Sequence, residues 1–220
     1  MNTTDGEVGG RKLRADAERN RQRIIASARE LFAERGLEVT LDDVAAHAGV
    51  GVGTVYRRFA NRDELIVGVL TQHLTEVAER ARETLDESDP WQAVVDILTL
   101  VVSSMAADRG LATMIMTIDH SHPDILAAKA VLTERLQQVL ARAHAAGVIR
   151  PDLEANDFFP ILTMLRTVAE SLAPTAPGTW RRYLGLILDG IRADGRDPLW
   201  GAPLTDAQIV QIQKGASRDR

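Results

Sequence analysis

The chain has 220 residues, of which 45% are hydrophobic and 26% charged, and its formal net charge is −5. This composition is typical of a globular protein with one large or two small domains that folds without disulfides or a structural metal. The absence of cysteine excludes thiolate zinc sites, iron–sulfur clusters and cysteine nucleophiles. No apolar run reaches the roughly 20 residues that span a bilayer, and the polar start lacks a secretory pattern, so we expect a cytoplasmic protein without a membrane partner.

Charge is distributed unevenly along the chain. Residues 1–62 hold 11 basic and 9 acidic side chains, whereas residues 63–220 hold 15 and 22. The sign of this difference favours a nucleic-acid-binding head on an acidic body. A solvated helix start with a ragged tail explains the same charges equally well.

Helical periodicity dominates the sequence. Apolar residues recur at helical spacing from end to end and alternating strand patterns are nearly absent, which predicts an all-α fold. A first helix is expected over 16–35, where an apolar stripe leads to a stop at Gly36. Thr40, followed by Asp43, predicts the N-cap of a short second helix that ends at Gly49.

A third short helix and a longer fourth one complete an N-terminal unit. The third is expected over 51–59, and Asn61 is the predicted N-cap of the fourth, which connects the unit to the rest of the chain. We therefore expect a compact three-helix domain over 16–62. The basic stretch before it, 1–15, is expected to be a flexible arm.

Longer helices are expected in residues 63–195, which we assign to a second domain. Their starts are predicted at Asp89-Pro90, near 111, at Pro123, near 158 and near 180, which gives about nine helices in all. Residues 196–220 hold two prolines and little periodicity before a helical candidate at 205–214. This pattern predicts a loosely docked tail.

The two short helices form the main functional signal. A helix, a glycine-containing turn and a second helix form the geometry that places the second helix in a DNA major groove. If Val55 and Phe59 face the core, small, hydroxyl-bearing and basic residues are left facing outward. Hydroxyls suit phosphate oxygens, and arginine can neutralise a phosphate or bind guanine with two hydrogen bonds. The outward residues are Val52, Gly53, Thr54, Tyr56, Arg57 and Arg58.

Four motifs follow one another in residues 21–66: Leu-Phe-Ala-Glu-Arg-Gly, Val-Ala-x-x-Ala-Gly-Val, Gly-Thr-Val-Tyr-x-x-Phe and Asn-Arg-Asp-Glu-Leu. In this order and spacing they resemble the DNA-binding head of the TetR family of transcriptional regulators. The resemblance implies an all-helical homodimer, in which three head helices bind DNA and a fourth connects them to a variable ligand-binding body.

The resemblance also implies which side chains contact the DNA backbone. Thr40 would cap the second helix beside a phosphate. Thr54, Tyr56 and Arg58 would contact the backbone directly. Arg62 occupies the position of a phosphate-binding lysine in the family and keeps its charge.

Base recognition is expected to depend on few side chains, mainly Gly53, Thr54 and Arg57. Val52 stands where a polar reader is common in the family, and Asp42 stands where some members have a basic one. An acid can accept a hydrogen bond from cytosine N4 or strengthen the helix start, and we favour the structural role. Three basic residues of the arm are candidates for a minor groove: Arg11, Lys12 and Arg14.

The helices expected over 158–172 and from 180 onward resemble the eighth and ninth helices of the family. In such relatives these helices pack against their symmetry mates as a four-helix bundle. Their apolar stripes here are wide enough to serve both a core and a partner. We therefore expect a homodimer through these two helices.

Candidates for an effector pocket lie in the second domain. They combine methionines and aromatic rings with a few polar groups, which is typical of an apolar ligand cavity and equally of an ordinary helical core. The pocket candidates are Trp91, Met105, Met114, His120, Phe158, Phe159, Thr163 and Arg166.

Residues 119–124 hold four potential metal ligands in the order Asp-His-Ser-His-Pro-Asp. The segment precedes a helix that starts with proline, where Asp119 and His120 equally suit a helix end and a solvated loop. We therefore expect no metal site and no cofactor.

The sequence predicts a regulator rather than an enzyme, because it contains no phosphate-cradling glycine loop, nucleophile elbow or HExxH motif. We expect a repressor that binds a palindromic operator in double-stranded DNA as a dimer and is released by a small-molecule effector. The alternative is a helical adaptor or regulator that uses the head without ligand control or without DNA binding. The intact DNA-facing residues argue against that alternative.

Overall fold

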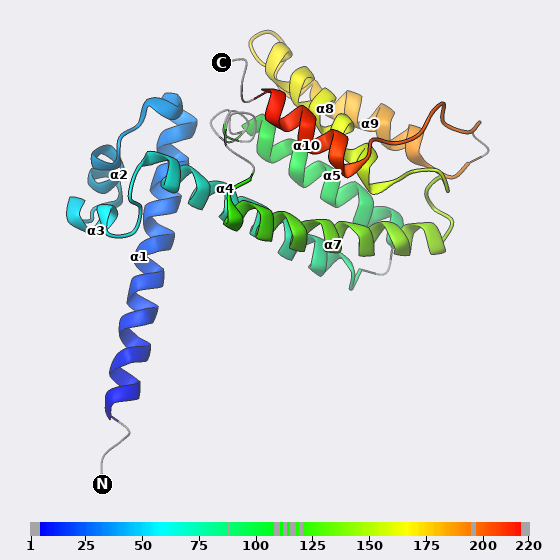
Figure 1. Cartoon of the computed structure of the whole chain (residues 1–220). Helices are drawn as coiled ribbons and strands as arrows, with labels where there is room; N and C mark the ends of the chain where they lie inside the picture. The colour runs from blue at the N-terminus through cyan, green and yellow to red at the C-terminus, as the bar shows by residue number, and fades with distance from the viewer. Residues whose placement is uncertain are drawn as a thin grey trace. The chain divides into compact units, whose positions relative to one another are not determined.

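A computed structural model describes residues 5–87, 89–107, 111, 114, 118, 121–194 and 197–216, with side chains from residue 16 onward except those of 37 and 213–216 (Figure 1). Within this part of the chain the secondary structure comprises nine α-helices, two short 3-10 helices and one isolated β-bridge, between Ile149 and Arg192. The predicted all-α class with about nine helices is therefore confirmed.

The chain divides into two compact units, Met1–Val69 and Leu70–Arg220, which we call the head and the body. The boundary lies beyond the predicted division between residues 62 and 63, inside the fourth helix. The reason is that the first turns of this helix pack against the head: a methyl group added at Gly68 would touch Phe59 and Ile25.

The head consists of short helices packed on one long one. Its elements are α1 (Asp5–Arg35), η1 (Gly36–Glu38), α2 (Leu41–Ala48), α3 (Val52–Tyr56) and the start of α4 (Arg62–Thr84). The apolar stripe predicted for the first helix is buried in the head core, as are the inward residues of α2 and α3. This core contains Ile24, Ile25, Ala28, Leu31, Phe32, Val44, Ala45 and Val55.

Local hydrogen bonds set the helix ends in the head. The Thr40 side chain accepts from the Asp43 amide, and the Asp43 carboxylate accepts from the Thr40 amide, which forms a capping box. Gly49 ends α2 with a φ of 63°, a left-handed conformation that favours glycine. Asn61 Oδ1 accepts from the Glu64 amide at 2.9 Å and caps α4. The three ends predicted from the sequence are confirmed.

The first helix begins much earlier than predicted. Residues 5–15, expected to be a flexible arm, continue α1 as one helix, which Figure 1 shows extending past α2 and α3. The composition explains the difference, because 11–18 is made mostly of good helix formers and contains no proline. Gly9 and Gly10 lower helix propensity without ending the helix.

The body is built from longer helices. After α4 come α5 (Pro90–Ala107), α7 (Pro123–Ala145), η2 (Ala155–Asp157), α8 (Phe158–Leu172), α9 (Trp180–Ile191) and α10 (Asp206–Ala216). The predicted cap of α5 is confirmed, because Asp89 Oδ1 accepts from the Trp91 amide at 2.9 Å. Of the segment predicted over 111–118, the described residues Leu111, Met114 and Ile118 are buried.

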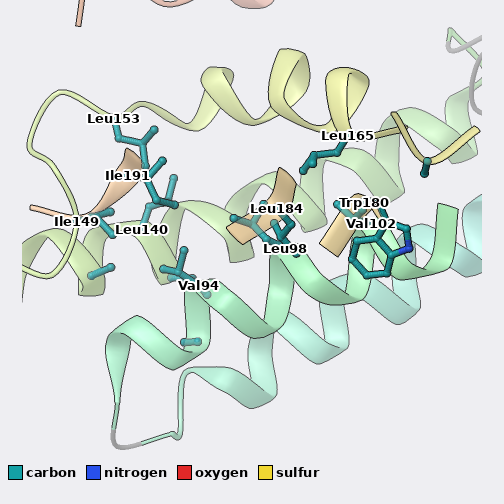
Figure 2. Packing of buried hydrophobic residues seen from close by; sticks show 14 residues of the cluster. Val94, Leu98, Val102, Leu140, Ile149, Leu153, Leu165, Trp180, Leu184 and Ile191 are labelled. Carbon is teal, nitrogen blue, oxygen red and sulfur yellow. The ribbon is translucent and has the colours of Figure 1, made fainter. Parts of the chain in front are cut away.

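One hydrophobic cluster joins four helices of the body (Figure 2). α5 contacts α7, α8 and α9, so it is the central helix of the cluster. Leu98 on α5 and Leu165 on α8 are 2% and 1% exposed. Burying a side chain of this size contributes about 1.5–3 kcal/mol, and the cluster therefore supplies much of the stability of the body.

The C-terminal tail is tied to the loop between α7 and α8. Arg150 pairs with Asp152 through two contacts, Nε–Oδ1 at 2.5 Å and Nη2–Oδ2 at 2.9 Å, and its Nη2 donates to the Asp197 carbonyl at 2.7 Å. Asp152 also accepts from the Leu199 amide at 2.8 Å. The Arg150 guanidinium, followed by this amide, holds the pKa of Asp152 well below its ordinary value.

A second set of contacts fixes the start of the last helix. Asn156 donates to the Leu204 carbonyl at 2.7 Å and to Asp206 Oδ1 at 2.9 Å. The predicted loose docking of 196–220 is therefore wrong for residues 197–206, because polar side chains far away in the sequence hold them. We call Arg150, Asp152 and Asn156, with these bonds to the tail, the tail clasp.

No helix in the described ranges is both long enough and apolar enough to cross a bilayer.

Candidate nucleic-acid interface

α3 buries one face and exposes the other. Val55 is 0% exposed and Phe59, just beyond the helix, is 4% exposed, whereas Val52 and Tyr56 are 45% and 51% exposed. Val52 and Tyr56 are four residues apart and so share a side of the helix. A side chain added at Gly53 would meet nothing within 4 Å. The orientation predicted for Val55 and Phe59 is confirmed.

Arginine side chains flank this exposed face. Arg57, Arg58 and Arg62 are exposed, and Arg57 Nη2 donates to the Thr54 hydroxyl at 3.2 Å. The helix ends at Tyr56, shorter than the predicted 51–59, because the Arg58 amide bonds to the Val55 carbonyl three residues back and tightens the last turn. Arg57 and Arg58 therefore lie at the end of α3 rather than inside it.

At the start of α2, the exposed Thr40 is a second polar group on the surface of the head. The Thr40 hydroxyl donates to Asp43 Oδ2 at 2.5 Å and accepts from the Asp43 amide at 3.1 Å. Hydrogen bonds from the Thr40 side chain and backbone lower the pKa of Asp43. Asp43 therefore stays ionised and keeps the cap intact at neutral pH.

The turn between α2 and α3 is held from α1. Arg23 Nη2 donates to the Ala48 carbonyl, the last of α2, at 2.6 Å. The same nitrogen would lie 3.6 Å from a methyl group placed on Gly49. This distance is an ordinary van der Waals contact, so the left-handed backbone conformation is what favours glycine at position 49.

The junction of α3 and α4 is closely packed. A methyl group added at Gly68 on α4 would approach Phe59 Cε1 to 2.9 Å, closer than carbon atoms pack. The guanidinium of Arg21 on α1 lies 6.0 Å from the centre of the Phe59 ring. The turn that carries Arg57 and Arg58 is therefore fixed against both helices.

Comparisons with known proteins match both parts of the chain. Residues 24–69 match the family described as bacterial regulatory proteins, tetR family, and residues 89–193 match the family described as transcriptional regulator SbtR-like, C-terminal domain. An HTH-type transcriptional regulator of Mycobacterium tuberculosis is 30% identical over 162 residues, covering 70% of this chain and 80% of that protein. The chain belongs to the TetR family of transcriptional regulators.

Solved structures agree with this membership. The TetR transcription regulatory protein from Mycobacterium vanbaalenii is 32% identical and covers 82% of this chain and 99% of its own, with a TM-score of 0.64. FadR from Bacillus subtilis, solved in complex with stearoyl-CoA, is 21% identical and covers 77% and 98%, with a TM-score of 0.57. At that identity the second likeness concerns the fold alone.

Two of the expected pocket residues are partly buried against the core of this TetR-family body. Trp91 and Phe158 pack against the hydrophobic cluster, and the guanidinium of Arg192 lies 4.1 Å from the centre of the Trp91 ring. Met105 and Met114 are buried. His120 lies outside the described residues.

The remaining pocket candidates share one side of α8. Phe159, Thr163 and Arg166 follow at helical spacing and are each half-buried. The Thr163 hydroxyl donates to the Phe159 carbonyl at 2.9 Å, and Arg166 Nη1 pairs with Glu170 at 2.6 Å. Arg166 Nε is buried and has no hydrogen-bond partner among the described residues.

The possible metal ligands before α7 are only partly described. The His122 side chain accepts from the Asp124 amide and caps α7. Asp119 and His120 lie outside the described residues. Nowhere in the described ranges do three carboxylate or imidazole side chains gather as a metal site would require.

Sequence reasoning missed two structural groups. Arg23 had no assigned role beyond its charge, since its partner Ala48 is 25 residues away. The tail clasp joins residues 47 and 50 positions apart, which no local pattern reveals. The one available signal was the Arg150-Pro151-Asp152 turn, in which two opposite charges lie within reach of each other.

Proposed function

We propose that the chain is a ligand-responsive transcriptional repressor that binds a palindromic operator as a homodimer and is released by a small molecule. The observation that carries the proposal is the orientation of α3, with Val55 buried and Tyr56 exposed beside Arg57 and Arg58. A face with hydroxyl and guanidinium groups, on the second helix of a helix-turn-helix, suits a DNA major groove.

The proposed DNA-binding surface makes two kinds of contact, with backbone phosphates and with bases. Backbone phosphates are assigned to hydroxyl and cationic groups, and bases to residues on α3 and at its C-terminal end. The phosphate contacts are Thr40, Thr54, Tyr56, Arg58 and Arg62; the base contacts are mainly Gly53, Thr54 and Arg57, with Val52 beside them. Arg57 can present two parallel donors to guanine, whereas Val52 can offer only apolar contact, for example to a thymine methyl group.

Apolar side chains on α8 and α9 support the homodimer. Met164 on α8 is 55% exposed, and Leu186 on α9 is 60% exposed beside the partly exposed Tyr183. A second copy of the same surface would cover them through a two-fold axis. Such a dimer presents two α3 helices to half-sites about 34–36 Å apart.

The body is the proposed sensor. FadR, which shares its fold, was solved in complex with stearoyl-CoA. The candidates here for an effector pocket are Trp91, Met105, Met114, Phe158, Phe159, Thr163 and Arg166, together with His120 outside the described residues. Effector binding would tilt α4 and change the separation of the two α3 helices, so that both half-sites are no longer met at once. A coupling of about 1–3 kcal/mol, or 5- to 150-fold in affinity, is enough for such a switch. The regulator would act in the cytoplasm.

Salt-dependent binding tests the DNA contacts. We expect Arg58→Ala and Arg62→Ala each to weaken binding to all duplexes and to reduce the salt slope by about one unit. Arg57→Ala should instead relax the base preference. Arg82→Ala, an exposed arginine of the body, serves as the control and should change neither quantity. An unchanged slope in both the Arg58 and Arg62 variants would reject the phosphate assignment.

A further inference from the structure

The end of α2 leaves backbone carbonyls that need partners. The turn that follows satisfies two of them, because the Gly49 amide bonds to the Ala46 carbonyl at 3.3 Å and the Val50 amide bonds to the Ala45 carbonyl at 3.0 Å. The Ala48 carbonyl is not one of the acceptors of this turn, and it accepts from Arg23 Nη2 at 2.6 Å. A side chain of α1 thus completes the cap that the turn begins.

We propose that Arg23 is a positioning residue for DNA recognition: it fixes the turn between α2 and α3, and so the direction in which α3 meets DNA. This inference rests on the proposed DNA binding by α3. It assigns Arg23 a role through the protein backbone and not through a phosphate.

The chemistry of this bond suits that role. The carbonyl end of a helix carries partial negative charge, so a guanidinium there is stabilised by the helix dipole as well as by the hydrogen bond. The apolar core between α1 and α2 resists separation but has little directional preference. The charge-assisted hydrogen bond from Arg23 to the Ala48 carbonyl is directional, so it fixes the orientation of the chain where α2 ends and the turn to α3 begins.

The position of the guanidinium supports a link to the turn itself. It lies against Gly49, within 3.6 Å of where a methyl group would stand. Only Val50 and Gly51 then separate Gly49 from the first residue of α3, and the Gly51 carbonyl accepts from the Thr54 amide at 2.8 Å. A shift of the turn is therefore passed directly to α3.

Binding of full-length variants to two duplexes tests the proposal. One duplex is selected by the unaltered chain from a random pool and the other is an unrelated sequence. Arg23→Met removes the donors and keeps an apolar stem, Arg23→Lys keeps one donor group and the charge, and Gln22→Met controls for methionine on α1. Thermal unfolding, followed by circular dichroism, identifies a temperature at which every variant is folded, and binding is measured at that temperature.

We expect Arg23→Met to weaken binding to the selected duplex about tenfold, the scale of one lost hydrogen bond to a charged group. Binding to the unrelated duplex and the salt slope should stay as in the unaltered chain. Arg23→Lys should recover most of the affinity, and Gln22→Met should lose none. If the methionine variant does not fold, Arg23→Gln, which keeps a donor without the charge, takes its place and should lose affinity for the selected duplex only.

Other results would overturn it. A salt slope reduced by about one unit in Arg23→Met, with equal weakening on both duplexes, would make Arg23 a phosphate contact. Unchanged affinity in a folded variant would leave only a stability role. Failure of the unaltered chain to bind any duplex would overturn the proposed function itself, and the role of Arg23 with it.

Discussion

The head and the C-terminal tail are both held by hydrogen bonds, but over very different lengths of chain. The caps at Thr40 and Asn61 join residues three positions apart. The tail clasp joins Asp152 to Leu199 and Asn156 to Asp206, 47 and 50 positions apart. Closing a longer loop costs more chain entropy, so the tail depends on a body that has already folded, whereas each cap needs only its own turn.

The head and the body also have separate hydrophobic cores, so a substitution in one core should destabilise mainly the unit that contains it. Phe32→Ala in the head and Leu98→Ala in the body each remove a buried side chain, at a cost of about 3–5 and 2–5 kcal/mol. All three tryptophans, at positions 91, 180 and 200, belong to the body. We expect Leu98→Ala to lower the denaturant midpoint followed by tryptophan fluorescence, and Phe32→Ala to abolish DNA binding with a smaller change in that midpoint.

Equal shifts of the tryptophan transition in both variants would contradict this independence. They would show that the head and the body unfold as one cooperative unit.

Substitution of two helical glycines by alanine tests how closely each position is packed. Gly68→Ala forces a methyl group against the Phe59 ring, and we expect overpacking to cost the head about 1–3 kcal/mol despite the better helix propensity of alanine. Gly185→Ala on α9 is the control, because a methyl group there meets nothing within 4 Å. It should leave the stability of the head unchanged, because α9 belongs to the body. Urea denaturation followed by circular dichroism measures both, and a stabilised Gly68→Ala would disprove the close contact.

A cap in the head should respond to pH. Thr40→Ala removes the capping box of α2 and should destabilise the head by about 1 kcal/mol at neutral pH. Asp43 has a lower pKa in the folded head than in the unfolded chain, so its contribution is complete above about pH 4 and is lost as the pH falls further. The difference between Thr40→Ala and the unaltered chain should therefore shrink in acid. A difference that is constant from pH 7 to acid would show that Asp43 is not part of the cap.

The tail clasp should affect global stability least. Asp152→Asn removes the charge that pairs with Arg150, and we expect the tail to loosen while the body core stays folded. Hydrogen exchange should become faster at the Leu199 amide and remain unchanged in α5. The matched variant Asp189→Asn, an exposed carboxylate of α9, should leave the Leu199 amide protected. Unchanged exchange at Leu199 in Asp152→Asn would contradict the clasp.

The sequence separation between hydrogen-bond partners also explains which features could be predicted from the sequence. The caps at Thr40 and Asn61 and the stop at Gly49 depend on residues a few positions apart, so their patterns are visible in the sequence and their positions are confirmed. The outward direction of Tyr56 followed from the helical period once Val55 was assigned to the core.

Long-range contacts could not be predicted in this way. The partner of Arg23 depends on how α1 and α2 pack, and the tail clasp depends on where the α7–α8 loop lies in the folded body. The start of α1 was missed for another reason: basic residues before a helix suit an arm and a helical extension equally well. The effector candidates stay a prediction, with Trp91 and Phe158 packed against the core.

Selection of bound duplexes from a random pool by the full-length chain tests the central claim, DNA recognition by the exposed face of α3. We expect enrichment of a palindrome with half-sites about one helical turn apart, and loss of that enrichment in a variant carrying Tyr56→Ala, Arg57→Ala and Arg58→Ala, which removes the assigned arginine base contact together with two phosphate contacts. The control Arg82→Ala should select the same palindrome. No enrichment by the unaltered chain in dilute salt, or the same palindrome selected by the Tyr56, Arg57 and Arg58 variant, would contradict the claim.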